Sequence, residues 1–354
     1  MDIPLLDPFV VATGELSTAQ NLFIRLSLQN GSVGYGEIAP FPDVTGEDRT
    51  SSFTMAKELG RAAIGQSATH FRRLAKVFRE IAPFHPAARC GLETALTDAA
   101  CRGGGLPLWA LWGGADIRIR ETDITIPITD LERTLILAGK WFRQGFRVFK
   151  MKVGKDVDQD IRRIEAIHRA FQDVAFIIDS NQGFSREEAL ECAKGVKGVG
   201  GIILLFEQPV PKDDLDGLTA LRSLLDIPIA ADESVQTLEG MKTIIQKQAA
   251  DFINIKITKT GLVEAAEMAS LARLAGLRLM IGGMVETRVA MGCSFGLVLG
   301  MGGFEVLDLD TPLLLAEDPV TGGFKYVGPQ LHPWEGPGLA LEVTPSAECF
   351  ILER

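Results

Sequence analysis

The run Ile202-Ile203-Leu204-Leu205-Phe206 is wholly apolar and ends at a charged residue, Glu207. Similar short apolar runs lie on both sides of it, and each also ends at one charged residue. The residues that end these runs are Lys152, Asp179, Glu207, Asp232, Lys256 and Asp308. They recur at steps of about 26 residues, with one double step before Asp308, and this is the length of a strand, a loop and a returning helix. The spacing therefore predicts a parallel β/α array.

Eight strands are expected in this array. The first begins near Thr122, and the apolar segment 277–282 fills the double step. We therefore predict an α/β fold with a modified (β/α)8-type barrel over residues 119–314. Charged residues at the C-terminal ends of parallel strands open onto one face, where barrel enzymes carry out their chemistry.

The remainder of the chain does not follow this period. Two apolar runs flank Asn30-Gly31, a strong hairpin signal, and a helical pattern continues from Ala87 to Cys101. We predict an α+β capping domain over residues 1–118, with the tail 315–354 folding back onto it. These segments account for a length of 354 residues, well beyond the roughly 250 of a minimal barrel.

The composition is that of an ordinary globular protein, with 46% hydrophobic and 23% charged residues. The formal net charge of −10 argues against binding to nucleic-acid phosphates. No run approaches the roughly 18 apolar residues of a membrane span, and the first residues do not resemble a signal peptide. We expect a cytoplasmic protein without nucleic-acid or membrane partners, and the sequence leaves a homo-oligomer open.

Asp179, Glu207 and Asp232 end three consecutive strands and should converge at one side of the barrel mouth. Three carboxylates held together repel one another unless a cation joins them, and oxygen ligands of this kind suit Mg²⁺ or Mn²⁺. Capping of the helix after the strand is the alternative role for each acid taken alone. Their occurrence in three successive units favours a metal site.

Lys152 and Lys256 end strands 2 and 6, which lie opposite each other in an eight-stranded barrel. A lysine that points into the mouth beside a metal can act as a base, whereas an isolated lysine usually extends to solvent. Lys150 shares a strand face with Lys152, so each ammonium group should lower the pKa of the other. Two opposed bases beside a metal suit removal of a proton next to a carboxylate, through an enediolate, and its return from the opposite side.

Two further segments could contact a substrate. Asp308 and Asp310 share a face of strand 8, and they could either hold an ammonium group or cap a helix. Gly283 and Met284 follow strand 7 and offer backbone donors for an anionic oxygen.

Together these segments resemble the enolase superfamily, in its muconate-lactonizing subgroup. The resemblance covers nearly the whole chain. It rests on Gly34-Tyr35-Gly36-Glu37, Thr45-Gly46-Glu47, Lys150-Met151-Lys152, Asp179-Ser180-Asn181-Gln182-Gly183, Glu207-Gln208-Pro209, Asp232-Glu233-Ser234 and Lys256-Ile257-Thr258-Lys259. The resemblance implies paired lysines at Lys150 and Lys152 and a second base at Lys256. The implied Mg²⁺ ligands are Asp179, Glu207 and Asp232, and the side chains expected to support them are Asn181, Glu233 and Glu286.

The segment Asp308-Leu309-Asp310 is similar to the D-x-D motif of dipeptide epimerases. In those enzymes the motif holds the α-ammonium group of the substrate. Met284 resembles the segment that binds the terminal carboxylate, with Gly283 where similar proteins often have Ser. The implied function is that of a Mg²⁺-dependent isomerase that inverts the α-carbon of the C-terminal residue of an L-Ala-X dipeptide.

The resemblance also bears on the side chain of X. Gly14 stands where relatives that epimerise L-Ala-Glu have an arginine, and no basic residue lies between Met1 and Arg25. A buried carboxylate without a partner is costly, so we expect X not to be acidic. Gly14 leaves room for an apolar side chain, whereas Glu15 could receive Lys or Arg, and both alternatives stay open. Loops near residues 14–20 and 42–48 are expected to cover the mouth.

Other functions fit less well. A muconate cycloisomerase or an o-succinylbenzoate synthase would share the lysines and metal ligands, but neither substrate has an ammonium group for Asp308 and Asp310. Sugar-acid dehydratases of the mandelate racemase type use a histidine on strand 7, and no histidine lies between Lys256 and Leu331. A non-catalytic metabolite-binding barrel would have no need of two opposed lysines.

Overall fold

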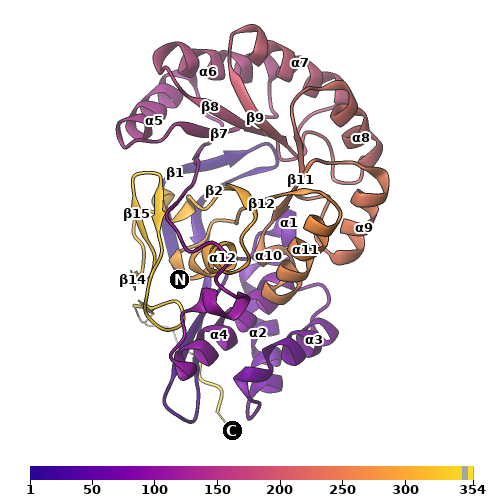
Figure 1. Cartoon of the computed structure of the whole chain (residues 1–354). Coiled ribbons are helices and arrows are strands. Elements are labelled where there is room, and N and C mark those ends of the chain that lie inside the picture. The colour runs from indigo at the N-terminus through magenta and orange to yellow at the C-terminus, as the bar shows by residue number, and fades with distance from the viewer. Residues whose placement is uncertain (345–349, 354) are drawn as a thin grey trace.

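The computed structural model describes residues 1–344 and 350–353. Its centre is a curved sheet of eight parallel strands that neighbour one another in chain order (Figure 1). The strands are β6 (Ile124–Ile126), β7 (Val148–Lys152), β8 (Ala175–Asp179), β9 (Ile202–Glu207), β10 (Ile229–Ala231), β11 (Phe252–Ile255), β12 (Arg278–Ile281) and β13 (Phe304–Leu307). The predicted α/β barrel is confirmed, including the strand in the double step.

A helix follows each strand except the last, and the helices after the first five strands form the outer arc in Figure 1, where they cover the outside of the sheet. The helices that follow the strands are α5 (Leu131–Arg143), α6 (Val157–Ala170), α7 (Arg186–Gly198), α8 (Leu215–Leu224), α9 (Leu238–Lys247), α10 (Ile257–Thr260), α11 (Leu262–Leu274) and α12 (Arg288–Met301). Side chains on the outer faces of the strands pack against these helices and form the main core.

A smaller apolar layer fills the inside of the barrel. Its fully buried members are Ile177, Leu205, Ala230, Phe252 and Met280. Side chains two positions apart on a strand point to the same side, so the residue two places after each of these also points inward. At three of those places stand the acids Asp179, Glu207 and Asp232. The apolar layer is therefore the floor on which the charged residues lie.

The first and last strands of the sheet approach each other without forming a ladder of hydrogen bonds. The Asp123 amide donates to the Leu307 carbonyl at 3.1 Å, and the Leu309 amide donates to Thr122 Oγ1 at 2.9 Å. These contacts close the seam of the barrel and bring the residue before β6 beside the end of β13.

The amino-terminal region contains two antiparallel hairpins followed by helices. Its elements are β1 (Asp2–Val11), β2 (Gly14–Gln20), β3 (Leu22–Ser27), β4 (Val33–Ile38), α1 (Pro42–Thr45), α2 (Arg49–Ala63), η1 (Ala68–His70), α3 (Phe71–Ile81), α4 (Pro86–Gly104) and η2 (Leu108–Trp112). Helix α4 packs tightly on β4 because the strand has glycines there: a Cβ at Gly36 would lie 2.0 Å from the Gly91 carbonyl oxygen. The expected loop over residues 14–20 is wrong, because these residues pair with β1 as strand β2.

The last part of the chain forms short strands that contact other regions. These are β14 (Val320–Gly322), β15 (Lys325–Val327), β16 (Gln330–His332) and β17 (Leu341–Val343), preceded by the short helix η3 (Thr311–Leu314). β16 pairs with β5 (Arg120–Glu121), while Glu342 accepts a hydrogen bond from Tyr35 of β4 at 2.5 Å. Part of the tail that we expected to fold back, residues 345–349 and 354, lies outside the described residues. No helix in the described part of the chain is long and apolar enough to cross a membrane.

Candidate active site

An open cavity lies at the C-terminal ends of the barrel strands. Its polar lining includes Lys150, Lys152, Asn181, Asp232, Glu233, Lys256 and Asp308. Its apolar lining includes Phe9 and Val11 of β1, Phe41 and Val44 beside α1, and Met284 and Val285 after β12. The cavity thus lies between the barrel mouth and two segments of the amino-terminal region, the β1–β2 turn and α1.

The three predicted metal ligands are buried side by side. Asp179 and Glu207 are register partners on β8 and β9, and Asp232 directly follows β10. None of them caps a helix, because the caps of α7, α8 and α9 are Ser185, Asp214 and Thr237. Helix capping, the alternative role for these acids, is therefore wrong.

Lysines approach these acids from opposite sides of the cavity. The Nζ atom of Lys152 lies 2.6 Å from Asp179 Oδ2, and that of Lys256 lies 2.7 Å from Asp232 Oδ2. Lys150 Nζ reaches three acids at once, at 2.6 Å from Asp308 Oδ2, 2.8 Å from Glu207 Oε2 and 3.0 Å from Asp179 Oδ2. Both candidate bases thus border the same carboxylate cluster.

The electrostatics of the cluster follow from burial and proximity. Burial raises the pKa of Glu207 to about 7, and the charges of Asp179 and Asp232 act in the same direction. Burial also acts to lower the pKa of Lys150, but Asp308 and Glu207 outweigh it and raise this pKa well above its usual value. The expectation that neighbouring lysines lower the pKa of Lys150 was therefore wrong: the carboxylates around it decide its charge.

The oxygen atoms gathered at this site are suitable ligands for a hard divalent cation. Three carboxylates that repel one another lie together, and the Oδ1 atom of Asn181 and the Oε2 atom of Glu233 beside them have no hydrogen-bond partner among the described residues. Oxygen atoms of this kind are what Mg²⁺ and Mn²⁺ prefer, with the coordination shell completed by water or substrate. Asp179, Glu207 and Asp232 would hold such a cation.

The remaining predicted supporting residues lie close by. Asn181 donates from its backbone to Asp179 Oδ1 at 2.9 Å and from Nδ2 to Glu233 Oε1 at 3.3 Å. Glu286 is fully buried and accepts a hydrogen bond from Thr258, which belongs to α10 just after Lys256. Asn181 and Glu233 therefore adjoin the cluster, whereas Glu286 contacts the segment that carries Lys256.

The predicted substrate-binding residues divide into two groups. Gly283 and Met284 line the cavity together with Asp308, while Asp310 lies behind it and accepts from the Thr125 amide at 2.6 Å. Asp310 stands at the start of η3 but its side chain makes no capping hydrogen bond, so capping is wrong for this residue too.

The specificity segment differs from the expectation at both residues, because neither Gly14 nor Glu15 is among the residues that line the cavity. Glu15 is exposed on β2 and does not line the cavity. Gly14 lies at the start of the same strand, and a Cβ there would lie 3.4 Å from Oδ2 of Asp43, a carboxylate that does line the cavity. Asp43 follows Pro42 in α1. The sequence does not show that Asp43 lies near Gly14, because the two residues are separated by strands β2, β3 and β4.

Comparison with known proteins agrees with this geometry. Residues 2–113 match the amino-terminal domain of the mandelate racemase/muconate lactonizing enzyme family, and residues 135–347 match its enolase C-terminal domain-like unit. The chain belongs to this family. The predicted enolase superfamily relationship is confirmed.

Members of the family that resemble this chain act on dipeptides and related amino acids. An L-Ala-D/L-amino acid epimerase from Populus trichocarpa is 42% identical over 93% of this chain and 79% of its own length. An aromatic dipeptide epimerase from Herpetosiphon aurantiacus is 38% identical over 94% and 93% of the two chains. The structure of a dipeptide epimerase from Methylococcus capsulatus, complexed with Mg and L-Arg-D-Lys, superposes with a TM-score of 0.90 at 32% identity, covering 96% of this chain and 97% of the other.

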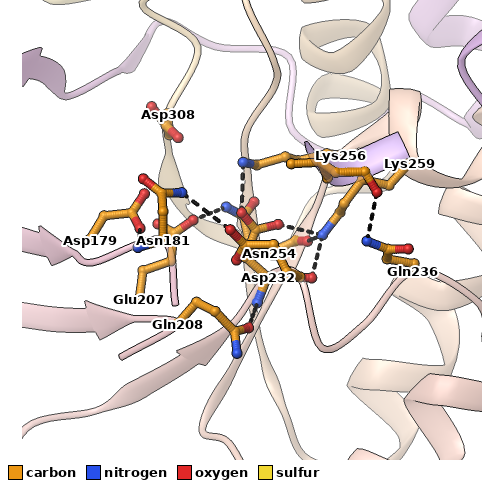
Figure 2. Close-up of polar contacts among 12 residues, drawn as sticks. Asp179, Asn181, Glu207, Gln208, Asp232, Gln236, Asn254, Lys256, Lys259 and Asp308 are labelled. Atoms are coloured by element: carbon orange, nitrogen blue, oxygen red, sulfur yellow. Dashed lines mark hydrogen bonds and ion pairs between the residues drawn. The ribbon is translucent and has the colours of Figure 1, made fainter. Parts of the chain in front are cut away.

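The sequence analysis did not predict three residues that lie at or beside the site of this chain. Lys259 of α10 donates to Asp232 Oδ1 at 2.5 Å, and Asn254 Nδ2 donates to Glu207 Oε1 at 2.8 Å. Figure 2 shows Lys256 and Lys259 both extending to Asp232. Asn254 could have been found, because it lies two positions before Lys256 and shares its strand face. The third, Asp123, follows no apolar run and is brought to the site only by closure of the barrel.

Proposed function

We propose that this chain is a Mg²⁺-dependent dipeptide epimerase that inverts the α-carbon of the C-terminal residue of its substrate. The observation that carries the proposal is the placement of Lys152 and Lys256 on opposite sides of one buried carboxylate cluster that opens into a cavity. A single base can remove a proton, but inversion of a carbon centre is most simply achieved by a second base on the other face.

The three acids of the cluster would hold Mg²⁺ against the carboxylate of the substrate. The cation supplies positive charge that makes the neighbouring C–H bond more acidic. Lys150 stays charged, because three carboxylates surround it, and it adds a fixed positive charge beside the same oxygen atoms. The backbone at Gly283 and Met284 would orient the substrate from above.

Proton transfer is assigned to the two lysines that face each other. When one of them is neutral, it takes the α-proton from its side, while the other, as an ammonium group, delivers a proton to the opposite side. Lys259 supports this exchange without taking part, since its ammonium group donates to Asp232 Oδ1 and to the Asp232 carbonyl, the latter at 2.7 Å, and so fixes the carboxylate beside Lys256.

Asp308 and Asp310 favour a dipeptide over the substrates of a cycloisomerase or an o-succinylbenzoate synthase. Asp308 borders the cavity, where its side chain could accept a hydrogen bond from the ammonium group of a dipeptide, a group that the other two substrates do not have. A non-catalytic binding barrel has no use for Lys152 and Lys256 on two faces. We also propose that residues 1–118 and the tail 315–354 act as one capping domain over the barrel formed by residues 119–314.

The side chain of the second residue is proposed to be cationic rather than acidic. The only cationic side chains among the described residues that line the cavity are Lys150, Lys152 and Lys256, and each is already paired with a carboxylate. At the capping side the cavity instead presents Asp43, which has no ion pair among the described residues, next to the apolar side chain of Phe41. A lysine side chain could lay its methylene groups on the apolar wall and its ammonium group against Asp43.

The test compares kcat/KM for L-Ala-L-Lys, L-Ala-L-Phe and L-Ala-L-Glu, with epimerisation followed by incorporation of solvent deuterium at the α-carbon. We expect the order Lys, Phe, Glu for the wild type. Asp43→Asn should lower activity on the lysine peptide by about tenfold, the worth of one charged hydrogen bond, and leave the phenylalanine peptide nearly unchanged. Glu15→Gln, an exposed neighbour, is the matched control. A preference for the glutamate peptide would refute the assignment of the side-chain subsite.

A further inference from the structure

Helix α6 carries a buried ion pair close to Lys152. Arg163 Nη2 lies 2.7 Å from Asp160 Oδ1, and the two side chains are only 4% and 3% exposed. A buried ion pair often adds no stability compared with apolar residues of the same size, because both charges lose their water. Stability alone therefore does not account for this pair, and its other hydrogen bonds indicate a second role.

These other hydrogen bonds reach the backbone around the end of β7, the strand that ends at Lys152. Arg163 Nη2 also donates to the Lys152 carbonyl at 2.6 Å, and Arg163 Nη1 donates to the Pro127 carbonyl at 3.0 Å. Asp160 Oδ2 accepts from the Gly154 amide at 2.8 Å. The ion pair thus binds the backbone at the candidate base and again two residues later.

The Lys152 carbonyl needs a donor from outside the sheet. The amide of the next residue, Val153, donates to the Asp179 carbonyl at 3.0 Å, on the side of β8. Since the N–H and C=O groups of one trans peptide point in opposite directions, the Lys152 carbonyl faces the other neighbouring strand, β6. There β6 is followed by Pro127, which has no N–H group to donate. Arg163 supplies the donor that the sheet lacks at this point.

The turn just after Lys152 depends on the same ion pair. Gly154 has a φ of 110°, a conformation that favours glycine. A Cβ at this position would lie 2.8 Å from the Ser180 carbonyl oxygen, so the turn packs closely against the loop after β8. The carboxylate of Asp160 binds the Gly154 amide in this turn and fixes its direction.

We propose that Arg163, held in place by Asp160, is a positioning residue for Lys152: it fixes the backbone from which this base reaches the α-carbon. The inference rests on the proposed function. A shift of the backbone moves the Nζ atom with it, and a misplacement of about 1 Å can slow a reaction about a hundredfold. Lys256 stands at the start of α10, on the opposite side of the cavity, so its position should not depend on Arg163.

The first arm of the test follows α-proton exchange in D₂O by NMR for L-Ala-L-Lys and L-Ala-D-Lys. In Arg163→Met, exchange should slow about tenfold to a hundredfold for the epimer that Lys152→Ala no longer exchanges, and by less than about threefold for the other. For the affected epimer kcat should fall with KM nearly unchanged, because Arg163 lies behind the base and does not touch the substrate. Equal slowing of both epimers, or of neither, would overturn the proposal.

A conservative variant and a matched control separate positioning from stability. Arg163→Lys keeps a charge beside Asp160 and should fold, but one ammonium group cannot replace the planar guanidinium fork, so a smaller loss is expected for the same epimer. The control is Arg120→Met. Arg120 donates to Asp116 Oδ2 and to the Phe304 carbonyl, both at 2.6 Å, at the start of β13 and thus at the end of the barrel away from the cavity. Arg120→Met should affect the two epimers equally.

The second arm needs no substrate. Hydrogen–deuterium exchange is measured by mass spectrometry for peptides that contain Gly154. Arg163→Met leaves the Lys152 carbonyl without its donor, so the segment should open more often and the Gly154 amide should exchange about tenfold faster. Arg120→Met should leave this amide unchanged. Unchanged protection in Arg163→Met would show that the ion pair does not hold the segment.

The two arms distinguish this inference from the proposed function. If neither dipeptide exchanges its α-proton in the wild type while Gly154 loses protection in Arg163→Met, the proposed function fails and the hold on the backbone at Lys152 stands. If both dipeptides exchange and Arg163→Met slows the two epimers equally, the positioning role is refuted and the epimerase stands.

Discussion

At the residue scale, the acids at the strand ends should make activity depend on a divalent cation. Asp232→Asn removes one charged ligand and leaves Lys256 and Lys259 without their common partner. We expect kcat/KM to fall about a thousandfold, or about 4 kcal/mol in the transition state. The control is Asp226→Asn, the same change at an exposed residue before β10. Full activity after exhaustive chelation, or in Asp232→Asn, would contradict the metal site.

Each of the two opposed lysines should serve one face of the substrate. Lys152→Ala should abolish α-proton exchange in one epimer while the other still exchanges with D₂O, and Lys256→Ala should show the opposite preference. The reason is distance: the remaining lysine, held at Asp179 or Asp232, reaches only its own side. Exchange is followed by NMR, with the exposed Lys155→Ala as control. Equal exchange of both epimers in either variant would mean that one base serves both faces.

At the element scale, helix α11 depends on a side chain from α4. The cap position of α11 is Gly261, which has no side chain, and Glu93 Oε2 accepts from the Val263 amide at 2.9 Å in its place. A Cβ at position 261 would lie 2.8 Å from Glu93 Oε1, so glycine makes room for this contact.

Glu93 should make stability depend on pH. Burial raises its pKa from 4.5 to about 7, although the Val263 amide and Arg89 act to lower it. The folded state therefore binds the proton more tightly than the unfolded chain, and the free energy of unfolding should fall as pH rises from 4.5 to about 7. Glu93→Gln should remove this part of the slope, on the order of 1 kcal/mol per pH unit. Urea unfolding at several pH values measures it, and equal slopes for the two proteins would exclude the effect.

At the scale of the whole molecule, the two ends of the chain are joined at Asp98 of α4. This fully buried carboxylate accepts from the Tyr35 amide at 2.8 Å and the Leu339 amide at 2.6 Å, and it pairs with Arg102 at 3.1 Å. Gly338 is required beside it, because a Cβ there would lie 2.1 Å from Asp98 Oδ1.

Breaking this joint should destabilise the whole protein. We expect Asp98→Asn to lower the free energy of unfolding by about 2 to 3 kcal/mol, since it removes the buried charge that pairs with Arg102 and places an NH2 group where one oxygen now accepts a backbone hydrogen bond. Glu342→Gln removes an exposed partner of the same arginine and should cost less than about 1 kcal/mol. Chemical denaturation compares the two variants with the wild type. A loss as small for Asp98 as for Glu342 would contradict this account.

By itself, the sequence determined the barrel and the residues on its floor. A strand has a period of two, and parallel strands in successive units end at the same face, so local spacing alone placed Asp179, Glu207 and Asp232 together. The paired lysines followed from the same rule, as did the hairpin at Asn30-Gly31, whose turn needs glycine at a φ of 85°. These features depend on residues near one another in the chain, and their pattern is therefore visible there.

Only the tertiary structure decided which groups meet across long separations in the chain. Asp123 reaches Asp308 because the first and last strands close the barrel, and the fold brings Asp43 Oδ2 within 3.4 Å of the place where a Cβ of Gly14 would stand. The charge of Lys150 was misjudged for the same reason, since the acids around it come from three different strands. Electrostatic energies depend on distance in space and on burial, and neither quantity is a function of local sequence spacing.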